Sequence, residues 1–193
     1  MKNRRFANIL FWLSAALILG VGLAVRLYRL TDVPLDFHPT RQLRATLIAR
    51  GMYYETRTDV PEWQRVEAVA QWKNENLIEP PLMERLTAFT YQMIGAEKVW
   101  VARVYSILFW TLGGLALLLL GRELGGPAAG LVAAGYYMMV PYAGIASRSF
   151  QPDPLMTALI CGAWWALARW LRSPSMRWAV AAGLLAVGIA LGG

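Results

Sequence analysis

The segment of residues 34–42 concentrates side chains that could do chemistry. It contains the only histidine of the chain, His38, with Asp36 two residues before it and Arg41 three residues after it. A carboxylate can accept a proton from a reacting group, and a guanidinium can bind a phosphate through two parallel hydrogen bonds. We therefore predict that this segment is part of an active site at a membrane and that Asp36 is its general base.

The position of Asp36 supports this role and also permits a simpler one. A helix is expected to begin near Pro39, because proline is favoured in the first turn of a helix. The free N–H groups of that turn could orient the Asp36 carboxylate. They would also lower its pKa, so an apolar surrounding would be needed to keep the carboxylate basic. The simpler interpretation is an aspartate that only shapes the turn before the helix.

Asp153 is the second carboxylate candidate. It is the only acidic residue after Glu123 and stands between Pro152 and Pro154, where an apolar run begins. An N-cap role is the simple alternative and could coexist with a role in a site. Because ionisable groups at a membrane boundary often mark functional sites, we predict that Asp153 is a catalytic-site residue that binds the acceptor or assists Asp36.

Three arginines could bind the phosphate group of a substrate, because their planar guanidinium groups match its oxygens. Arg41 and Arg44 lie one turn apart on the helix expected after Pro39, and Arg148 precedes Asp153 by five residues. The alternative is that all three arginines contact lipid headgroups at the membrane surface.

His38 has two interpretations. It could ligate a divalent metal together with Glu79 or Asp153, or it could be a polar group that is hydrogen-bonded within its own loop. A lone histidine with scattered acidic residues is a weak metal signal, so the second interpretation is favoured. The sequence requires no cofactor, and a divalent metal stays open as an addition.

The chain that must position these residues is strongly apolar. Its 193 residues are 57% hydrophobic and its mean hydropathy is +0.39, which is typical of a multi-span membrane protein. The net charge of +7 comes largely from basic residues that flank the apolar runs, among them Arg26 and Arg29. Such residues lie at loop ends and lipid headgroups, so membrane lipids are expected partners and nucleic acid is not.

Five apolar runs are predicted to cross the membrane as helices. They comprise residues 6–25, 99–120, 128–146 with a kink at Pro141, 154–171 and 178–193, and a short turn is expected at Gly125-Gly126-Pro127. Basic residues at positions 2, 4 and 5 favour a cytoplasmic N-terminus. The last run reaches the end of the sequence without a polar tail, which suggests that residues 1–193 are the N-terminal transmembrane part of a longer protein.

Residues 30–98 form a polar loop that is expected on the outer side of the membrane. They hold ten of the twelve acidic residues. Two amphipathic helices are predicted to lie on the membrane surface, from Pro39 to Gly51 and from Pro80-Pro81 to Gly95. Their apolar stripes comprise Leu43, Leu47 and Ile48 in the first helix and Leu82, Leu86, Phe89 and Met93 in the second. No structure is predicted for residues 53–76.

Three motifs, in this order and on one side of the membrane, resemble those of GT-C class membrane glycosyltransferases. This class uses polyprenyl-phosphate sugars and includes protein O-mannosyltransferases and the bacterial enzyme that adds aminoarabinose to lipid A. The motifs are Asp36 after the first span, Pro80-Pro81-Leu82 opening a surface helix, and Ser147-Arg148 followed by Asp153-Pro154-Leu155 at the outer start of the fourth span. Each motif is short, and their order and spacing make the set specific.

The resemblance implies a GT-C-like helical bundle in a membrane, with the bacterial inner membrane as the expected location. It implies an inverting enzyme that moves a monosaccharide from a polyprenyl-phosphate donor to a lipid, glycan or protein acceptor at the outer face, with Asp36 as the base. Because relatives have more spans, residues 1–193 alone are expected to be inactive.

Two positions depart from the pattern of the resembling enzymes. Many relatives have Asp-Glu where this chain has Asp36-Phe37, and many have lysine before the Pro-Pro-Leu motif, where this chain has Glu79. The lysine's contact with the donor phosphate therefore does not carry over, and Glu79 is predicted to contribute to the substrate site in another way. The presence of His38 and Glu79 strengthens the interpretation as a metal site slightly, because both residues are of types that ligate metals.

The rival function is a non-enzymatic multi-span transporter or lipid-binding protein. That class would explain the spans and their basic flanks. Transporters, however, tend to place ionisable residues or broken helices near the middle of the membrane. Here the polar residues are concentrated in the loop of residues 30–98, which favours the enzyme.

Overall fold

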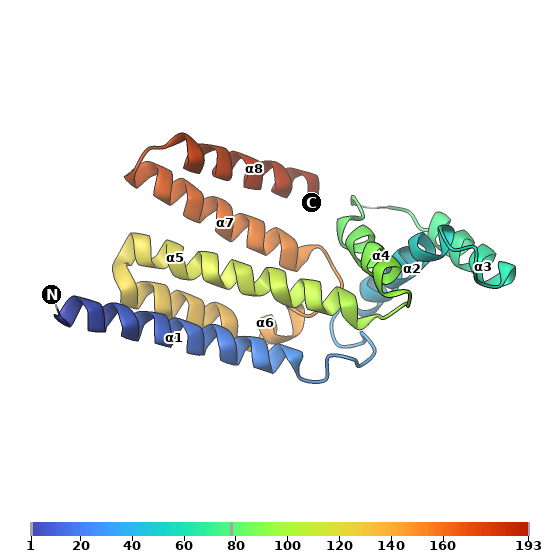
Figure 1. The fold of residues 1–193 in the computed structure, drawn as a ribbon, viewed down its shortest axis with the longest axis horizontal. Helices are drawn as coiled ribbons and strands as arrows, with labels where there is room; N and C mark the ends of the chain where they lie inside the picture. Colours follow the sequence, from blue (N-terminus) through green and yellow to red (C-terminus); the bar gives the residue numbers. More distant parts are fainter. Residues whose placement is uncertain (1, 78, 193) are drawn as a thin grey trace.

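The computed structural model describes residues 2–77 and 79–192. Within these ranges all regular secondary structure is α-helical (Figure 1), which confirms the predicted all-α fold. The helices there are α1 (Lys2–Leu27), α2 (Pro39–Glu55), α3 (Glu62–Lys73), α4 (Leu82–Ile94), α5 (Trp100–Met139), α6 (Pro141–Ala146), α7 (Asp153–Arg172) and α8 (Met176–Gly192).

The long helices α1, α5, α7 and α8 run side by side and form a bundle (Figure 1). Two segments among the described residues, Arg4–Leu27 and Trp100–Met139, are long and apolar enough to cross a bilayer, and Met176–Ala190 is a shorter apolar helix. The helices are consistent with a helical membrane protein. The long helices lie in the apolar runs predicted to cross the membrane, and the second run and most of the third run are joined in α5.

The chain reverses direction within α5, at the turn that the sequence predicts (Figure 1). Gly126 has φ 85° and ψ −177°, a conformation that is open essentially only to glycine. The two halves of α5 then pack closely, because a Cβ atom at Gly130 would lie 2.5 Å from the carbonyl oxygen of Leu118. The second half of α5 ends at Met139, and α6 begins at Pro141 after the extended residue Val140. The helix is therefore interrupted before Pro141, where the sequence predicted only a kink.

Helices α2, α3 and α4 form a smaller unit at one end of the bundle (Figure 1). The prediction that the first of these helices stops at Gly51 was wrong, because α2 continues to Glu55 and Gly51 is buried within it. A Cβ atom at Gly51 would lie 2.0 Å from Cδ1 of Trp72 on α3. The glycine therefore permits close packing between α2 and α3, and α3 itself was not predicted.

Most residues of the predicted apolar stripes of α2 and α4 lie outside the buried faces of these helices, and Ile48 is the exception. Leu43 on α2 is exposed, as are Phe89 and Met93 on α4, where the exposed fraction reaches 73%. The buried faces combine small or polar residues, which permit close approach of the helix backbones, with a few larger side chains. These are Gln42, Ala45, Ile48 and Ala49 on α2 and Met83, Thr87, Ala88 and Tyr91 on α4. The large apolar side chains remain on the outer surface, where they fit contact with lipid.

Arg26 contradicts its predicted place among the charges at a loop end, because its side chain is buried in the bundle. Its Nε donates to Oγ of Ser147 at 2.6 Å, and its Nη1 donates to the carbonyl oxygens of Gly22 at 2.8 Å and Met138 at 3.0 Å. Arg26 thus joins the end of α1 to the broken end of α5 and to the residue that follows α6. These hydrogen bonds offset part of the cost of burying the guanidinium group.

Candidate functional site

A polar cleft of about 430 Å³ lies where the end of α1 continues into the loop of residues 28–38. That loop lies at the end of the bundle that carries α2, α3 and α4 (Figure 1). The cleft is lined by Tyr28, Arg29, Asp32, Val33, Leu35, Asp36, Arg103 and Arg148. It therefore contains one of the two predicted carboxylates, Asp36, and one of the three predicted phosphate-binding arginines, Arg148.

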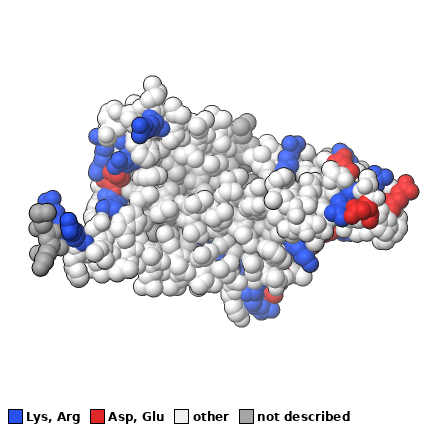
Figure 2. Space-filling model, in the orientation of Figure 1, with Lys and Arg blue, Asp and Glu red and all other residues white. Residues whose placement is uncertain are grey.

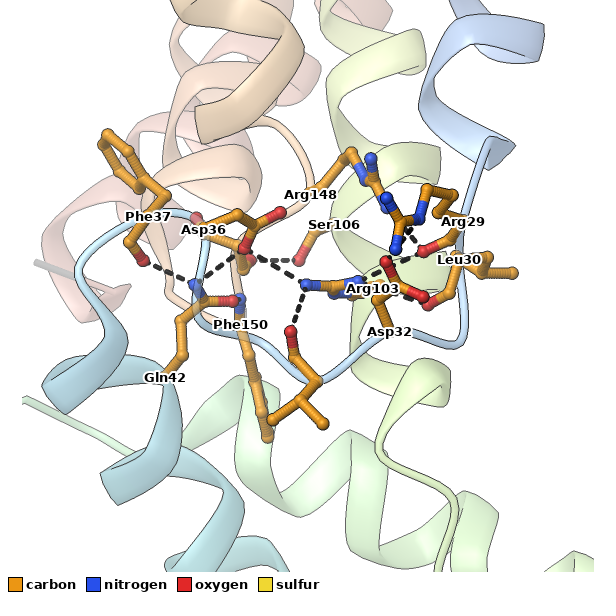
Figure 3. Close-up of polar contacts among 12 residues, drawn as sticks. Arg29, Leu30, Asp32, Asp36, Phe37, Gln42, Arg103, Ser106, Arg148 and Phe150 are labelled. Carbon is orange, nitrogen blue, oxygen red and sulfur yellow. Dashed lines mark hydrogen bonds and ion pairs between the residues drawn. The ribbon is translucent and has the colours of Figure 1, made fainter.

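Side chains from two helices hold the Asp36 carboxylate (Figure 3). Its Oδ1 lies 3.1 Å from Nη2 of Arg103 on α5 and accepts a hydrogen bond from Nε2 of Gln42 on α2 at 3.4 Å. The side chain of Arg103 is buried, while that of Asp36 is 35% exposed. We predicted that backbone N–H groups of the following helix orient Asp36. That prediction was wrong, because the side chains of Arg103 and Gln42 orient it instead.

Arg103 also organises the loop that carries Asp36. Its guanidinium donates long hydrogen bonds to the carbonyl oxygens of Arg29 at 3.5 Å, Leu30 at 3.4 Å and Val33 at 3.4 Å. One buried cation therefore gathers several residues of the loop around itself. Arg103 was not among the site residues predicted from the sequence, although an arginine within an apolar run is a signal of a functional group.

Gln42 connects the Asp36 loop to the segment between α6 and α7. It is fully buried, and its amide nitrogen bonds both Asp36 and the carbonyl oxygen of Phe37. Its amide oxygen accepts a hydrogen bond from the backbone N–H of Phe150 at 3.0 Å. Ser106 on α5 holds the same segment, because its hydroxyl donates to the carbonyl oxygen of Ser149 at 2.6 Å. Nothing in the local sequence around Gln42 indicated this role.

Arg148 reaches the cleft from that segment (Figure 3). Its Nη2 donates to the carbonyl oxygen of Arg29 at 2.9 Å, so that Arg148 and Arg103 share one acceptor. Burial, followed by the nearby Arg103 charge, lowers the pKa of Arg148, and the carboxylates of Asp36 and Asp32 oppose this shift. Three arginines and two aspartates thus line this cleft, so that positive charge exceeds negative charge there.

The other predicted arginines lie outside this cleft. Arg41 pairs with Glu79 at 3.2 Å, and Arg44 pairs with Glu75 at 2.9 Å. Arg41, Arg44 and Glu79 line a smaller hollow of about 30 Å³, together with Glu84. Burial is the first cause that raises the pKa of Glu84, and the charge of Glu79 adds to it. Each of the two arginines therefore already has a carboxylate partner.

Asp153 and His38 line neither hollow. Asp153 is the exposed first residue of α7, and the N-cap of that helix is Pro152, so the N-cap interpretation of Asp153 was wrong. His38 precedes α2 in a left-handed conformation with φ 45°, and its ring contacts that of Phe37 edge-on at 4.4 Å. Across residues 2–77 and 79–192, no group of three or more His, Cys, Asp or Glu side chains could hold a metal ion.

Comparison with known families identifies a match over more than half of the chain. A family model described as dolichyl-phosphate-mannose-protein mannosyltransferase matches residues 78–192. Neither the comparison with curated proteins nor that with solved structures returned a match. The matched region contains Arg103 and Arg148 but not Asp36. The contacts of Asp36 with Arg103 and of Gln42 with Phe150 join the unmatched loop to the matched region.

Proposed function

Because the chain belongs to the dolichyl-phosphate-mannose-protein mannosyltransferase family, we propose that sugar transfer takes place in the cleft around Asp36. Members of this family are GT-C glycosyltransferases, integral to the membrane, that take a sugar from a polyprenyl phosphate. For this chain we propose an inverting reaction at the outer face, with a lipid, glycan or protein hydroxyl group as the acceptor. Family membership favours this enzyme over a transporter or a lipid-binding protein.

The environment of Asp36 is the observation that carries the proposal. The carboxylate is held by Arg103 and Gln42 and still reaches the cleft with about a third of its side chain exposed. A base must be both held in place and accessible to the acceptor proton. Among the acidic residues predicted to act in catalysis, Asp36 has both properties, whereas the exposed Asp153 carboxylate lines neither this cleft nor the hollow beside Arg41.

The proposed reaction is a single displacement at the anomeric carbon of the donor sugar. The acceptor oxygen forms a bond to that carbon while Asp36 takes the acceptor proton, and the bond from the carbon to the phosphate oxygen breaks with its electron pair. One displacement inverts the configuration. The departing phosphate is weakly basic, so it needs no separate general acid, in contrast to the leaving group in glycoside hydrolysis.

Arg148 is the proposed partner of the donor phosphate. Its guanidinium lines the cleft with Asp36, and within the described residues it makes one hydrogen bond, to the carbonyl oxygen of Arg29. Other N–H groups are therefore available for a phosphate. Arg41, Arg44 and Glu79 are proposed to act at the edge of the substrate site rather than at the reacting atoms. Asp153 is proposed to contact the acceptor.

Replacement of Asp36 by asparagine tests the base directly. In the full-length protein, Asp36→Asn should reduce the rate of transfer from labelled polyprenyl-phosphate sugars by about 10²–10⁴-fold, which is the usual contribution of a general base. Donor binding should remain, because asparagine is nearly the same shape and can still accept a hydrogen bond from Arg103.

The matched control is Asp32→Asn, since Asp32 lines the same cleft and forms an ion pair with the exposed Arg29. We expect that variant to retain most of the transfer rate. Near-normal transfer by Asp36→Asn, or an equal loss in both variants, would remove Asp36 from the role of base.

A further inference from the structure

A second large hollow lies at the opposite end of the bundle from the cleft. It has a volume of about 530 Å³ and is formed by the first turns of α1 and the turn within α5. Basic side chains gather at that end of the molecule, whereas both signs of charge are mixed around α2, α3 and α4 (Figure 2). The lining residues are Arg4, Arg5, Ala7, Asn8, Phe11, Arg122 and Pro127.

Arg122 is positioned in this hollow by neutral partners. Its guanidinium carbon lies 4.6 Å from the ring centre of Phe11 and 5.5 Å from that of Trp12, and Nη2 donates to Oδ1 of Asn8 at 3.4 Å. Contacts with aromatic faces orient an arginine without cancelling its charge. Arg122 is thus held in place and keeps a positive charge directed at the hollow.

The hollow has no negative charge of its own. Its lining contains three arginines and no acidic residue, and none of those arginines forms an ion pair with another of the described residues. Glu123, the neighbour of Arg122 in the sequence, is engaged by Arg169 at 2.8 Å and by Arg172 at 3.4 Å. An anion that entered the hollow would meet only positive charge and neutral side chains.

We propose that this hollow binds the phosphate headgroup of an anionic phospholipid, at the membrane face opposite the cleft. The 26 residues of α1 span about 39 Å at 1.5 Å per residue, which is enough to separate the two sites by the thickness of a bilayer. Guanidinium groups pair with phosphate oxygens through two hydrogen bonds, and basic pockets between membrane helices bind anionic headgroups.

The neutral part of the lining favours a lipid over free phosphate. Ala7, Phe11 and Pro127 supply an apolar wall beside the arginines, and Trp12 is partly exposed next to it. A lipid headgroup would place its phosphate on the guanidinium groups and its glycerol and first acyl carbons on this wall. Free phosphate would use the charges alone.

Retention of lipid by the purified full-length protein tests the proposal. The protein is reconstituted in phosphatidylcholine vesicles that contain a minor fraction of phosphatidylglycerol, extracted in detergent, and analysed for bound phosphatidylglycerol by native mass spectrometry. Arg122→Gln should reduce retention about tenfold, which corresponds to the loss of one charge-assisted hydrogen-bonded contact. The matched control is Arg177→Gln, because Arg177 is exposed near the same end and does not line the hollow.

Arg5→Gln is a second test that leaves the aromatic contacts of Arg122 intact, and we expect it to reduce retention in the same direction. Equal losses in the Arg122→Gln and Arg177→Gln variants would mean that only general surface charge attracts the lipid, which would overturn the proposal. Unchanged retention in both Arg122→Gln and Arg5→Gln would overturn it too. Displacement of the lipid by millimolar inorganic phosphate would identify free phosphate as the ligand instead. None of these readouts depends on sugar transfer.

Discussion

Asp36 and Arg103 form the pair on which the proposed chemistry rests. Their ion pair places a buried cation against a carboxylate that faces a cleft. Removing one member of such a pair leaves the other without its partner. Any substitution at Arg103 is therefore expected to affect the position of Asp36 as well as the charge of the cleft, which makes Arg103 a poor site for testing the phosphate-binding step alone. Arg148 is better suited to that test.

Glu84 gives a pH-dependent prediction at the scale of a single residue. Its pKa is raised above the ordinary value of 4.5 by burial first and by the charge of Glu79 second. The folded protein therefore binds a proton at Glu84 more tightly than the unfolded chain does. As a result, the contribution of Glu84 to the free energy of unfolding falls as the pH rises from about 4.5 through the raised pKa. In Glu84→Gln this dependence is absent, and the Tm of the variant minus that of the wild type should increase with pH across this window.

The exposed first-turn residue Glu62 of α3 supplies the matched control. Thermal unfolding curves recorded at several pH values from about 4, close to the usual pKa of a glutamate, to about 8 should show no comparable trend for Glu62→Gln. A difference between Glu84→Gln and the wild type that stays constant across this range would contradict the role given to burial.

At the scale of elements, close contacts made possible by glycine determine how the helices meet. Gly130 allows the two halves of α5 to pack against each other, and Gly51 allows α3 to approach α2. The second contact positions the helix that begins three residues after Asp36. The small unit of α2, α3 and α4 therefore depends on one position at which a side chain does not fit.

We predict that Gly51→Ala destabilises the protein even though alanine favours helices by about 1 kcal/mol over glycine. The added Cβ atom would lie 2.0 Å from Cδ1 and 2.6 Å from Cβ of Trp72, and overpacking of this kind costs about 1–3 kcal/mol or more. Thermal unfolding of the detergent-solubilised protein measures the effect as a lower Tm.

Gly20→Ala is the control for Gly51→Ala, because Gly20 is also helical and a Cβ atom there meets nothing within 4 Å. That variant should have an unchanged or raised Tm. If Gly51→Ala were as stable as Gly20→Ala, the close contact with Trp72 would not constrain the helix pair.

At the scale of the whole molecule, the two ends of the bundle differ in charge and in the sites they carry. The cleft lies at the end of α1 and the arginine-rich hollow at its beginning. Basic side chains gather at the end with the hollow, and charges of both signs are mixed around α2, α3 and α4 (Figure 2). Basic residues collect on the cytoplasmic side of membrane proteins. On this ground we propose that the N-terminus lies in the cytoplasm and the cleft outside.

Cysteine labelling tests that orientation. In a Cys161→Ala background, which removes the only native thiol, we expect Asp32→Cys to react with a membrane-impermeant maleimide on intact cells. Ser173→Cys, in the turn between α7 and α8, should react only after the cells are opened. The reverse pattern would place the cleft on the cytoplasmic side and would contradict the proposed site of transfer.

Much of the architecture follows from periodicity and hydropathy, because helices in a membrane must satisfy their own backbone hydrogen bonds. The apolar runs predict the bundle, and Gly125-Gly126-Pro127 predicts the turn. The packing of α2 and α4 does not follow in the same way. Their buried faces consist of residues such as Ala49 and Thr87, which were not in the predicted stripes, since the size of the gap between helices, and not hydrophobicity alone, selects them.

The candidate site likewise has features that the sequence predicts and features that only the tertiary structure shows. The sequence by itself determined the helical membrane class, the resemblance to GT-C enzymes and the choice of Asp36, because these depend on composition and short motifs. Only the tertiary structure decided that Arg103 and Gln42 hold Asp36, that Arg148 shares its cleft, and that Arg41 and Arg44 have carboxylate partners elsewhere. Asp36 and Arg103 are 67 positions apart in the chain. No local pattern records such a pairing, because it forms only when the loop after α1 packs against the first turns of α5.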